Sequence, residues 1–213
     1  ECQAKAFTVS GYTSAEVLQE FLNELTDACE QGKTKKDFLD SINDFLERNG
    51  YTGLNPFRAD VIFRTNIQTA YNAGHYKSMT DPTTRKLRPY WKYVTAGDGE
   101  VRETHAMMEG RIYPADDPVW DIWYPPNGFR CRCTVVSLTK RQAEREAERI
   151  SKGLPYETDY ETGEILYRYP DQGFSHNAAK DGWKPDLSEL DPGVRQAFRA
   201  RKPEKDAGAR SGH

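Results

Sequence analysis

Residues 90–136 read YWKYVTAGDGEVRETHAMMEGRIYPADDPVWDIWYPPNGFRCRCTVV and hold three of the chain's four tryptophans and two of its four cysteines. The sequence on either side consists mainly of helical patterns and polar segments. Aromatic residues, a histidine and paired cysteines in one block are typical of a small core built from loops and short strands. We therefore expect the particular chemistry of this protein to lie here.

Several short elements are predicted inside and just beyond this block. Residues 90–95 alternate aromatic and polar side chains as a strand does, and Ala96-Gly97-Asp98-Gly99 then forms a turn. The pattern favours a short helix over 102–109, a short strand over 111–113 and an aromatic-rich loop over 118–126. Residues 130–138 are rich in β-branched side chains and predict the clearest strand of the chain.

The paired cysteines indicate a possible metal centre. In an extended strand, residues i and i+2 share a face, so Cys131 and Cys133 would present both sulfurs on one side. With His105 from another element they make a soft-ligand set suited to structural zinc, which would contribute on the order of 10 kcal/mol to folding. The fourth ligand is open, with candidates Asp98, Glu109 and His75. The alternative is that both cysteines are small buried hydrophobes beside a hydrogen-bonded histidine.

Catalytic motifs are not matched by this block. Zinc deaminases place a His and a Glu two residues apart and two cysteines three apart, whereas His105 and Glu109 are four apart here and Cys131 and Cys133 two apart. The zinc-protease motif, the nucleophile elbow and the glycine-rich phosphate loop are missing from the sequence. A non-enzymatic protein is therefore expected. The alternative is a nucleotide- or nucleic-acid-modifying enzyme or toxin-like module, acting on NAD or nucleic acid, with a site around Arg64, His105 and Glu109.

The aromatic side chains are expected to form the core of a small domain, with an exposed patch for a partner as the alternative. We expect Trp91 and at least one of Trp120 and Trp123 to be buried. Charge-assisted hydrogen bonds from three charged residues would stabilise the loops. These charged residues are Asp98, Arg102 and Arg132. The other aromatic and proline residues expected in the core of the small domain are Tyr90, Tyr124, Phe129, Pro125 and Pro126.

Three helices are predicted before the block. The first covers 13–32, with capping-box spacing of Thr13 and Glu16, and the second follows the Thr34 and Asp37 pair and ends at Asn49-Gly50. Together they indicate a helical hairpin. The third helix starts near Asn55-Pro56, continues to about Lys77 and is ended by Thr80-Asp81-Pro82. Its expected core face consists of Val61, Ile62, Ile67, Ala70 and Tyr71.

The C-terminal part is predicted to be more polar. Residues 139–152 indicate a charged, solvated helix, and residues 156–169 indicate a hairpin around Glu161-Thr162-Gly163. The end of the chain is irregular and basic in places, which suggests either a solvated tail or a weak contact with DNA phosphates. The basic residues of this tail are Arg195, Arg199, Arg201 and Lys202.

Bulk composition limits the class of protein. The 213 residues are 37% hydrophobic and 30% charged, with a net charge of −3, which argues against a dedicated nucleic-acid binder. No apolar run approaches the roughly 20 residues of a membrane span, and four cysteines in this length suggest a reducing cytoplasm. The start at Glu1 leads us to expect a fragment or a processed product.

The fold class expected is α+β, with N-terminal helices, a small mixed β region with long aromatic-rich loops, a charged C-terminal helix and an irregular tail. Three domains are expected: a helical hairpin at 1–54, a central domain at 55–177 and a polar tail at 178–213.

The order of these residues resembles a known family. The chain is similar to the minor head protein family named after phage Mu protein F, also called the phage head morphogenesis family, over roughly residues 57–177. The resemblance rests on Arg64-Thr65, Ala70-Tyr71-Asn72, Gly74, Pro89-Tyr90-Trp91, Asp98, Val101-Arg102, His105, Glu109-Gly110, Asp117-Pro118, Trp120, Pro125-Pro126-Asn127-Gly128, Cys131-Arg132-Cys133, Asp171-Gln172-Gly173-Phe174 and Asn177.

The resemblance implies a minor capsid protein of a tailed phage or prophage, which associates with the portal protein and other head proteins during assembly. It implies a place in the virion, in the capsid interior or at the portal vertex, after assembly in the host cytoplasm, and contact with packaged double-stranded DNA in some members. In related members the positions matching Arg102 and Gly128 can be Cys and His, beside the equivalents of His105 and both cysteines. This chain lacks those two additional candidate ligands.

Overall fold

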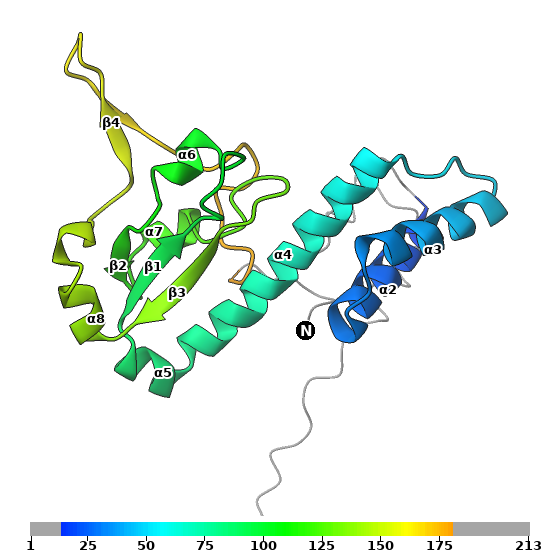
Figure 1. Cartoon of the computed structure of the whole chain (residues 1–213), viewed down its shortest axis with the longest axis horizontal. Coiled ribbons are helices and arrows are strands. Elements are labelled where there is room, and N and C mark those ends of the chain that lie inside the picture. The colour runs from blue at the N-terminus through cyan, green and yellow to red at the C-terminus, as the bar shows by residue number, and fades with distance from the viewer. Residues whose placement is uncertain (1–13, 181–213) are drawn as a thin grey trace, which may run out of the picture.

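The computed structural model describes residues 14–180 and confirms the α+β class (Figure 1). Its helices are α2 (Ala15–Gln31), α3 (Lys35–Arg48), α4 (Pro56–Thr80), α5 (Pro82–Leu87), α6 (Glu103–Ala106), α7 (Val119–Ile122), α8 (Lys140–Glu144) and the 3-10 helix η1 (Ala147–Arg149). Its strands are β1 (Tyr90–Val94), β2 (Ile112–Pro114), β3 (Thr134–Leu138), β4 (Tyr156–Thr158) and β5 (Ile165–Tyr167).

The two N-terminal helices form the predicted hairpin. Gly32 ends α2 in the left-handed conformation, with φ of 71°, and its N–H donates to the Ala28 carbonyl. Thr34 and Asp37 form the predicted capping box of α3. The start of α2 differs from the prediction, because Ser14 rather than Thr13 precedes its first turn and makes no side-chain cap bond.

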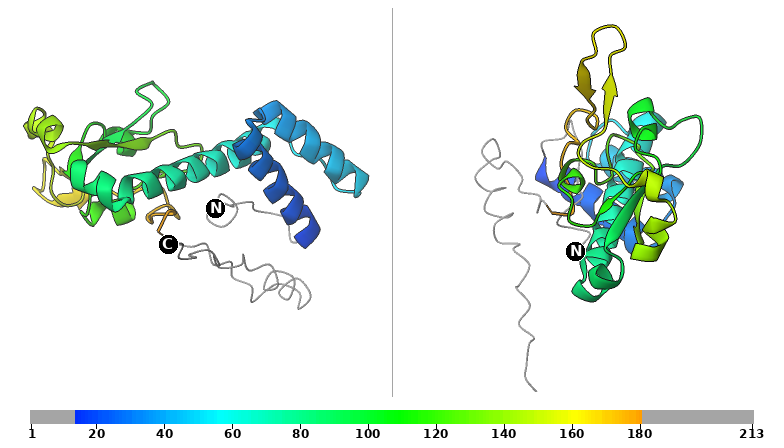
Figure 2. Two further views of the ribbon diagram at one scale, coloured as in Figure 1. Left: turned by 90° about the horizontal axis from the view of Figure 1, so that it is seen from below. Right: turned by 90° about the vertical axis from the view of Figure 1, so that its left-hand side faces the viewer.

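Helix α4 is shared by two separate cores. Asn55 caps it, accepting a hydrogen bond from the Arg58 N–H at 2.8 Å, and Pro56 occupies the first turn as predicted. Its N-terminal half contributes to an aliphatic and phenylalanine core, here named the helical core, and its C-terminal half reaches the β region (Figures 1 and 2). The helical core consists of Val17, Phe21, Leu25, Phe38, Ile42, Leu46, Leu54, Ala59 and Ile62.

The predicted core face of α4 holds in part. Ile62 and Ala70 are buried, Val61 and Ile67 are half-buried, and Tyr71 is 58% exposed, so the assignment of Tyr71 to the core is wrong. The helix continues three residues beyond Lys77 to Thr80. Pro82 then begins α5, a short helix that the sequence reading did not predict.

The central sheet has the order β2-β1-β3 and is antiparallel throughout, with Trp91 opposite Tyr113 on one side and Ser137 on the other. Among the described residues, parallel pairing is confined to the isolated bridge between Ile112 and Ile150. The alternation of β1 directs Trp91 and Tyr93 inward. The predicted strand at 90–95 is confirmed.

The aromatic residues form the second core, here named the aromatic core. Trp91, Trp120 and Trp123 are all buried, as expected, and edge-on or tilted ring pairs connect the core. Phe129 differs from the expectation, since it is exposed. The aromatic core consists of Met79, Trp91, Tyr93, Met108, Tyr113, Ala115, Val119, Trp120, Trp123, Tyr124, Cys131, Cys133 and Val135.

Three predicted boundaries change. The aromatic-rich loop contains the short helix α7, in which Trp120 donates from Nε1 to the Pro114 carbonyl at 2.9 Å. Strand β3 begins at Thr134, not Arg130, because residues 130–133 are taken up by contacts to α4 and His105. The charged helix begins with a capping box of Thr139 and Gln142 and ends at Glu144, earlier than predicted, followed by η1.

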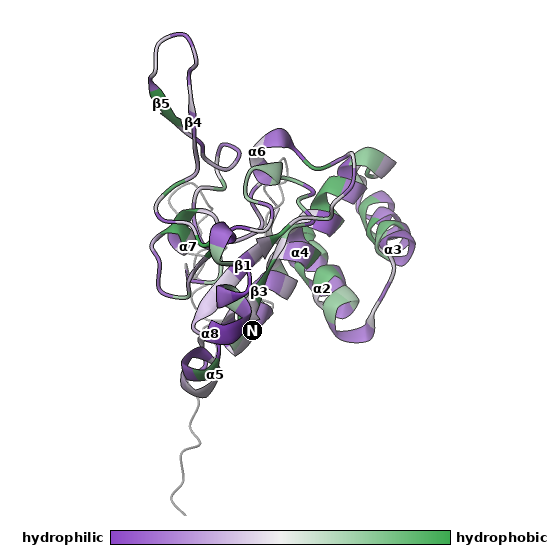
Figure 3. Ribbon diagram, turned by 60° about the vertical axis from the view of Figure 1, so that its left-hand side comes forward, coloured by the Kyte–Doolittle hydropathy of each residue, from purple (hydrophilic) through white to green (hydrophobic). Residues whose placement is uncertain are grey.

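Strands β4 and β5 form the predicted hairpin, which projects from the body of the molecule (Figures 1 and 2). Its exposed apolar side chains include Tyr156, Ile165 and Tyr167. Figure 3 shows that apolar and polar residues alternate around α2 and α3, whose apolar sides supply the helical core. No helix in residues 14–180 combines the length and apolar character that a membrane span requires.

Candidate metal centre

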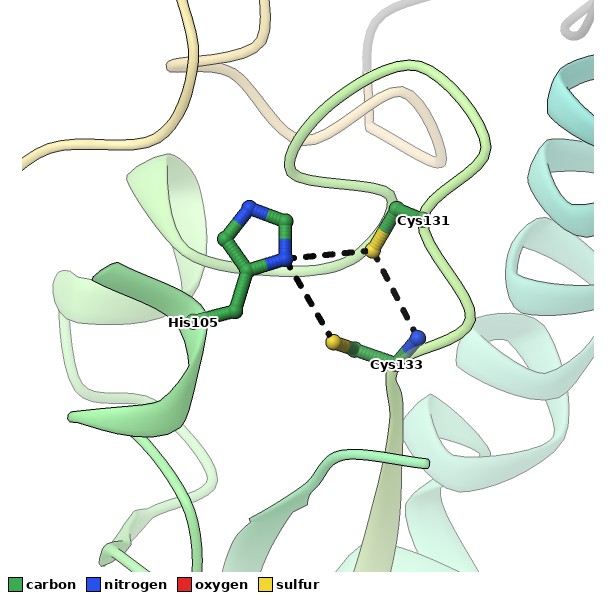
Figure 4. Close-up of side chains that lie close together, drawn as sticks. All are labelled: His105, Cys131 and Cys133. Carbon is green, nitrogen blue, oxygen red and sulfur yellow. Dashed lines mark hydrogen bonds between the residues drawn. The ribbon is translucent and has the colours of Figure 1, made fainter. Parts of the chain in front are cut away.

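His105, Cys131 and Cys133 come together as predicted and form what we name the sulfur–imidazole cluster (Figure 4). The His105 Nδ1 lies 3.8 Å from the Cys131 Sγ and 3.6 Å from the Cys133 Sγ. The three potential ligand atoms lie within 4.8 Å of one another, and all three residues are buried. One imidazole nitrogen thus faces two sulfurs inside the aromatic core.

The two cysteines are positioned by a loop rather than by a strand. The predicted strand begins later than expected, since β3 starts only after Cys133, but both sulfurs lie on one side and face His105 as predicted. The loop turns so that the Cys133 N–H lies 3.5 Å from the Cys131 Sγ. His105 lies on α6, which follows the turn after strand β1. The cysteines follow a turn at residues 129–130 and precede β3, and from this segment both sulfurs face the His105 Nδ1.

Helix α4 holds this loop through side-chain hydrogen bonds. Gln68 and Asn72 both donate from their amide groups to the Cys133 carbonyl, at 3.0 and 3.2 Å. The Thr134 hydroxyl donates to the Asn72 Oδ1 at 3.2 Å. Asn72 was included in the family pattern. Gln68 was not predicted as a site residue, and its only signal in the sequence is its place beside Asn66 and Asn72 in an amide-rich stretch of α4.

The tautomer of His105 follows from its second nitrogen. The Nε2 lies 3.2 Å from the Asn127 carbonyl, which can only accept, so we assign the proton to Nε2. The lone pair of Nδ1 then points toward the sulfurs. Asn127 is itself held, because its Oδ1 accepts the Tyr93 hydroxyl at 2.7 Å. A ligand histidine whose other nitrogen donates to a carbonyl is the usual arrangement in metal sites.

The two thiols differ in acidity. A hydrogen bond from Cys133 lowers the pKa of Cys131 and outweighs burial, which opposes ionisation, and backbone hydrogen bonds from Asn127 and Cys133 lower the pKa further. The same contact with Cys131, together with burial, raises the pKa of Cys133. The Cys131 thiol therefore ionises more readily than the Cys133 thiol. A divalent cation would allow both sulfurs to ionise.

Two buried donors beside the cluster lack an acceptor. Among residues 14–180, the Trp123 Nε1 and the Asn127 Nδ2 are buried without a hydrogen-bond partner. The Trp123 ring lies edge-on to His105, with centroids 6.4 Å apart. Buried donors of this kind normally find a partner. Both groups are donors, so the partner that would satisfy them is an acceptor such as a water molecule.

None of the three expected fourth ligands joins the cluster. Asp98 is held by Arg132, whose Nη atoms lie 2.5 and 2.7 Å from its carboxylate. Glu109 accepts the Thr95 N–H at 2.6 Å. His75 lies on α4 against Tyr71, and burial lowers the pKa of His75. The described residues supply three ligands, and a fourth would have to be a water or another group.

The predicted charged contacts stabilise the surrounding loops. Arg102 donates to the Phe129 carbonyl at 2.7 Å and pairs with Asp171 at 3.2 Å. A side chain at Gly128 would collide with that Asp171 carboxylate. Arg102 thus forms an ion pair in this chain, and Gly128 lies against it.

Three further positions of the family motif, one glycine and two prolines, lie near this region. Gly110 has φ of 74° and its backbone lies against Arg149, so a side chain there would be strained and would clash. Pro125 and Pro126 are buried and joined by a cis peptide bond.

The residues of the enzymatic alternative do not assemble into one hydrogen-bonded site. Arg64 pairs with Asp60, Glu109 accepts from the Thr95 backbone, and His105 faces the cysteines. The basic positions Arg195, Arg199, Arg201 and Lys202 lie outside the described residues.

The chain matches the family described as "Phage Mu protein F like protein" over residues 19–136. It is 30% identical to "Putative capsid assembly protein F" of Escherichia phage Mu, an alignment that covers 83% of this chain and 48% of that protein. It is 33% identical to "Mu-like prophage FluMu F protein" of Haemophilus influenzae, over 70% of this chain and 38% of that protein. No solved structure shows a significant match.

The chain thus spans less than half the length of either relative. The family match begins within α2 and ends within β3, so it includes the helical hairpin and excludes the β4–β5 hairpin. It covers more than half of the chain, includes the entire sulfur–imidazole cluster, and establishes that this chain belongs to the phage Mu protein F-like family.

Proposed function

We propose that this chain is a structural component of head assembly in a tailed phage or prophage, and that it performs no turnover. The observation that carries the proposal is the family match together with a relative named as a putative capsid assembly protein. The separation of Arg64, His105 and Glu109 into different contacts agrees with a structural role.

The partners we propose are the portal protein and other head proteins, with a location in the virion at the portal vertex or capsid interior. The helical hairpin within 1–54 would supply contacts to the portal or scaffold, and the central domain at 55–177 would supply the rigid body. The exposed face of α3 carries ion pairs of Lys36 with Asp40 and Arg48 with Asp44. The tail at 178–213 would make a secondary contact with packaged DNA through its basic residues.

The proposal is tested by purifying proheads and virions and locating this chain by mass spectrometry and labelling. We expect it at a single vertex in few copies. The double variant Lys36→Glu with Arg48→Glu, which leaves the buried face of α3 intact, should reduce incorporation. Lys86→Glu on α5 is the matched control. Absence of the chain from both particles would contradict the proposal, as would turnover of NAD, RNA or DNA that is lost in Glu109→Ala.

We also propose that His105, Cys131 and Cys133 hold a structural zinc ion. The convergence of the His105 Nδ1 lone pair and two buried sulfurs, with all three ligand atoms within 4.8 Å of one another, supports it. Bound zinc would act as a cross-link between α6 and the loop before β3, with no reaction assigned to it.

Elemental analysis of protein purified without added metal should show about one zinc per chain. Cys131→Ser and Cys133→Ser should each lower the zinc content and the melting temperature, whereas Cys29→Ser on α2 should leave the zinc content unchanged. Zinc-free protein in which Cys131→Ser costs no more than a small core cavity, about 1 kcal/mol, would favour the packing alternative.

A further inference from the structure

Asp60 on α4 is the centre of an ion-pair network outside the sulfur–imidazole cluster. Its Oδ1 receives the Lys35 Nζ at 2.7 Å and the Arg64 Nε at 2.9 Å, while the Arg130 Nε lies 2.8 Å from its Oδ2. The three cations come from three elements: Lys35 from α3, Arg64 from α4 and Arg130 from the loop before β3. We name these three residues the cation cluster.

The network carries more positive charge than its own carboxylate neutralises. Within residues 14–180, Asp60 is the only acid paired with any member of the cation cluster. Three cations against one carboxylate leave an excess of two positive charges. The Asp60 side chain is only 9% exposed, whereas the cation side chains are 45–47% exposed. The excess charge is therefore accessible to solvent ions.

The geometry leaves most of the hydrogen-bonding capacity of the two arginines unused by Asp60. Each guanidinium faces the carboxylate through its Nε atom. The four Nη hydrogens of each group remain for another acceptor. Pairs of guanidinium groups are the usual means of binding phosphate oxygens, because their planar donor sets match the anion.

The backbone at Arg130 is held in an unfavourable conformation. Its φ is 58°, which makes it the one non-glycine residue with positive φ in the described part of the chain. The Arg130 N–H donates to the Thr65 hydroxyl at 3.1 Å, and the guanidinium lies 5.8 Å from the centre of the Phe57 ring. Strain of this kind is concentrated at binding sites. A surface ion pair alone does not require a strained backbone. The strain therefore indicates a further role for the position of Arg130.

We propose that the cation cluster is a phosphate-binding site, which takes either inorganic phosphate or the phosphate groups of a DNA backbone. A phosphate dianion balances the two excess charges, and the Nη edges supply its donors. Asp60 then has a positioning role, because it fixes the three cations around one point. The proposal is independent of the role in head assembly, since it rests on the contacts of Asp60 alone.

The test titrates the full chain with inorganic phosphate at constant ionic strength, with chloride as the balancing ion, and follows binding by calorimetry. Arg64→Gln and Arg130→Gln should each weaken binding about tenfold or more, the effect of losing one charge-assisted contact. Arg48→Gln is the matched control, because Arg48 is an exposed helical arginine paired only with Asp44 among the described residues. It should change the affinity less than twofold.

A second titration with a short DNA duplex separates the two sources of phosphate. If the backbone is the ligand, Arg64→Gln should weaken duplex binding and reduce its salt slope by about one. A chain with Gln at 195, 199, 201 and 202 should retain this dependence on Arg64. If free phosphate is the ligand, the wild-type chain and Arg64→Gln should bind the duplex with equal affinity. They should then differ only in their affinity for inorganic phosphate.

Arg130→Gly separates binding from folding. It relieves the positive φ and leaves Asp60 paired with Lys35 and Arg64, so the melting temperature should stay within about 5 °C while phosphate affinity falls. The proposal is overturned if the wild-type chain binds no phosphate, if Arg48→Gln loses as much affinity as Arg64→Gln, or if the cluster binds polyglutamate in place of phosphate.

Discussion

The helical core and the aromatic core are stabilised in different ways. The helical core is built from aliphatic side chains and phenylalanines that contain no polar side-chain atom. The aromatic core contains tryptophans, tyrosines and cysteines, and within residues 14–180 the indole nitrogens of Trp91 and Trp123 and the Tyr113 hydroxyl are buried there without a hydrogen-bond partner. The helical core is therefore stabilised by the close packing of apolar side chains. The aromatic core also needs directional contacts and, as proposed, a bound ion.

The largest expected effect tests whether the two cores unfold together. Phe38 is fully buried and lies against Phe21 and Phe63. Phe38→Ala should reduce the free energy of unfolding by ~3–5 kcal/mol. Because α4 belongs to both cores, tryptophan fluorescence, which reports on the aromatic core, and far-ultraviolet circular dichroism should change at the same lowered temperature. Two separate transitions would show that the cores are independent.

The next effect concerns the junction between the regions and depends on pH. Burial opposes ionisation of Asp60, but hydrogen bonds from Lys35 and Arg64 outweigh it and lower the pKa of Asp60 to about 2. A lowered pKa contributes stability above the unfolded value near 3.9, and that contribution disappears as the pH falls toward 2.

We therefore expect Asp60→Asn to reduce stability by ~2 kcal/mol at neutral pH, and the difference from wild type to shrink between about pH 4 and pH 2. Denaturant unfolding at a series of pH values measures this difference. Asp40→Asn on exposed α3 is the control. A difference that stays constant with pH would mean that the cations do not stabilise ionised Asp60.

Asn72 tests the directional contacts of the aromatic core. Asn72→Ala removes one of the two amides that hold the Cys133 carbonyl and should cost ~1–3 kcal/mol. Gln68→Ala removes the other amide from a half-buried position and should cost less, because water can replace it. Both free energies come from chemical denaturation. Equal losses would show that burial does not determine the strength of this attachment.

The smallest effect compares the same capping motif in the two regions. Thr34 caps α3, which buries three side chains in the helical core, and Thr139 caps the five-residue α8, which buries only Ala143. Thr34→Ala should cost about 1 kcal/mol, and Thr139→Ala about half of that, since a short helix frays more easily. Thermal melts of both variants measure this. A larger loss at Thr139 would contradict the difference in packing.

The helical region could be predicted well from sequence because its elements are local. The Thr34 and Asp37 pair, Gly32 and Asn55-Pro56 specify helix ends through contacts within a few residues. The prediction failed for Tyr71, since periodicity does not tell which neighbours cover a helix face. Short α7 was missed because a four-residue helix inside a proline-rich loop has no periodic signal.

The meeting of His105, Cys131 and Cys133 was predicted from residue chemistry, while its geometry was not. The strand pattern of 130–138 suggested a shared strand face. Residues 130–133 instead form a loop, in which the Cys133 carbonyl accepts from Gln68 and Asn72 and the Arg130 N–H donates to the Thr65 hydroxyl. Those contacts join residues more than 60 positions apart. The cation cluster around Asp60 was invisible for the same reason, because its members meet only in the folded chain.

The 25 residues of α4 make a rod about 37 Å long, and both of its ends are clamped by hydrophobic packing. Bending the molecule between its two halves would require breaking helical backbone hydrogen bonds. Any object that attaches to α2 and α3 is therefore held at one distance and one angle from any object that attaches to the central sheet. The chain is built as a spacer of fixed length.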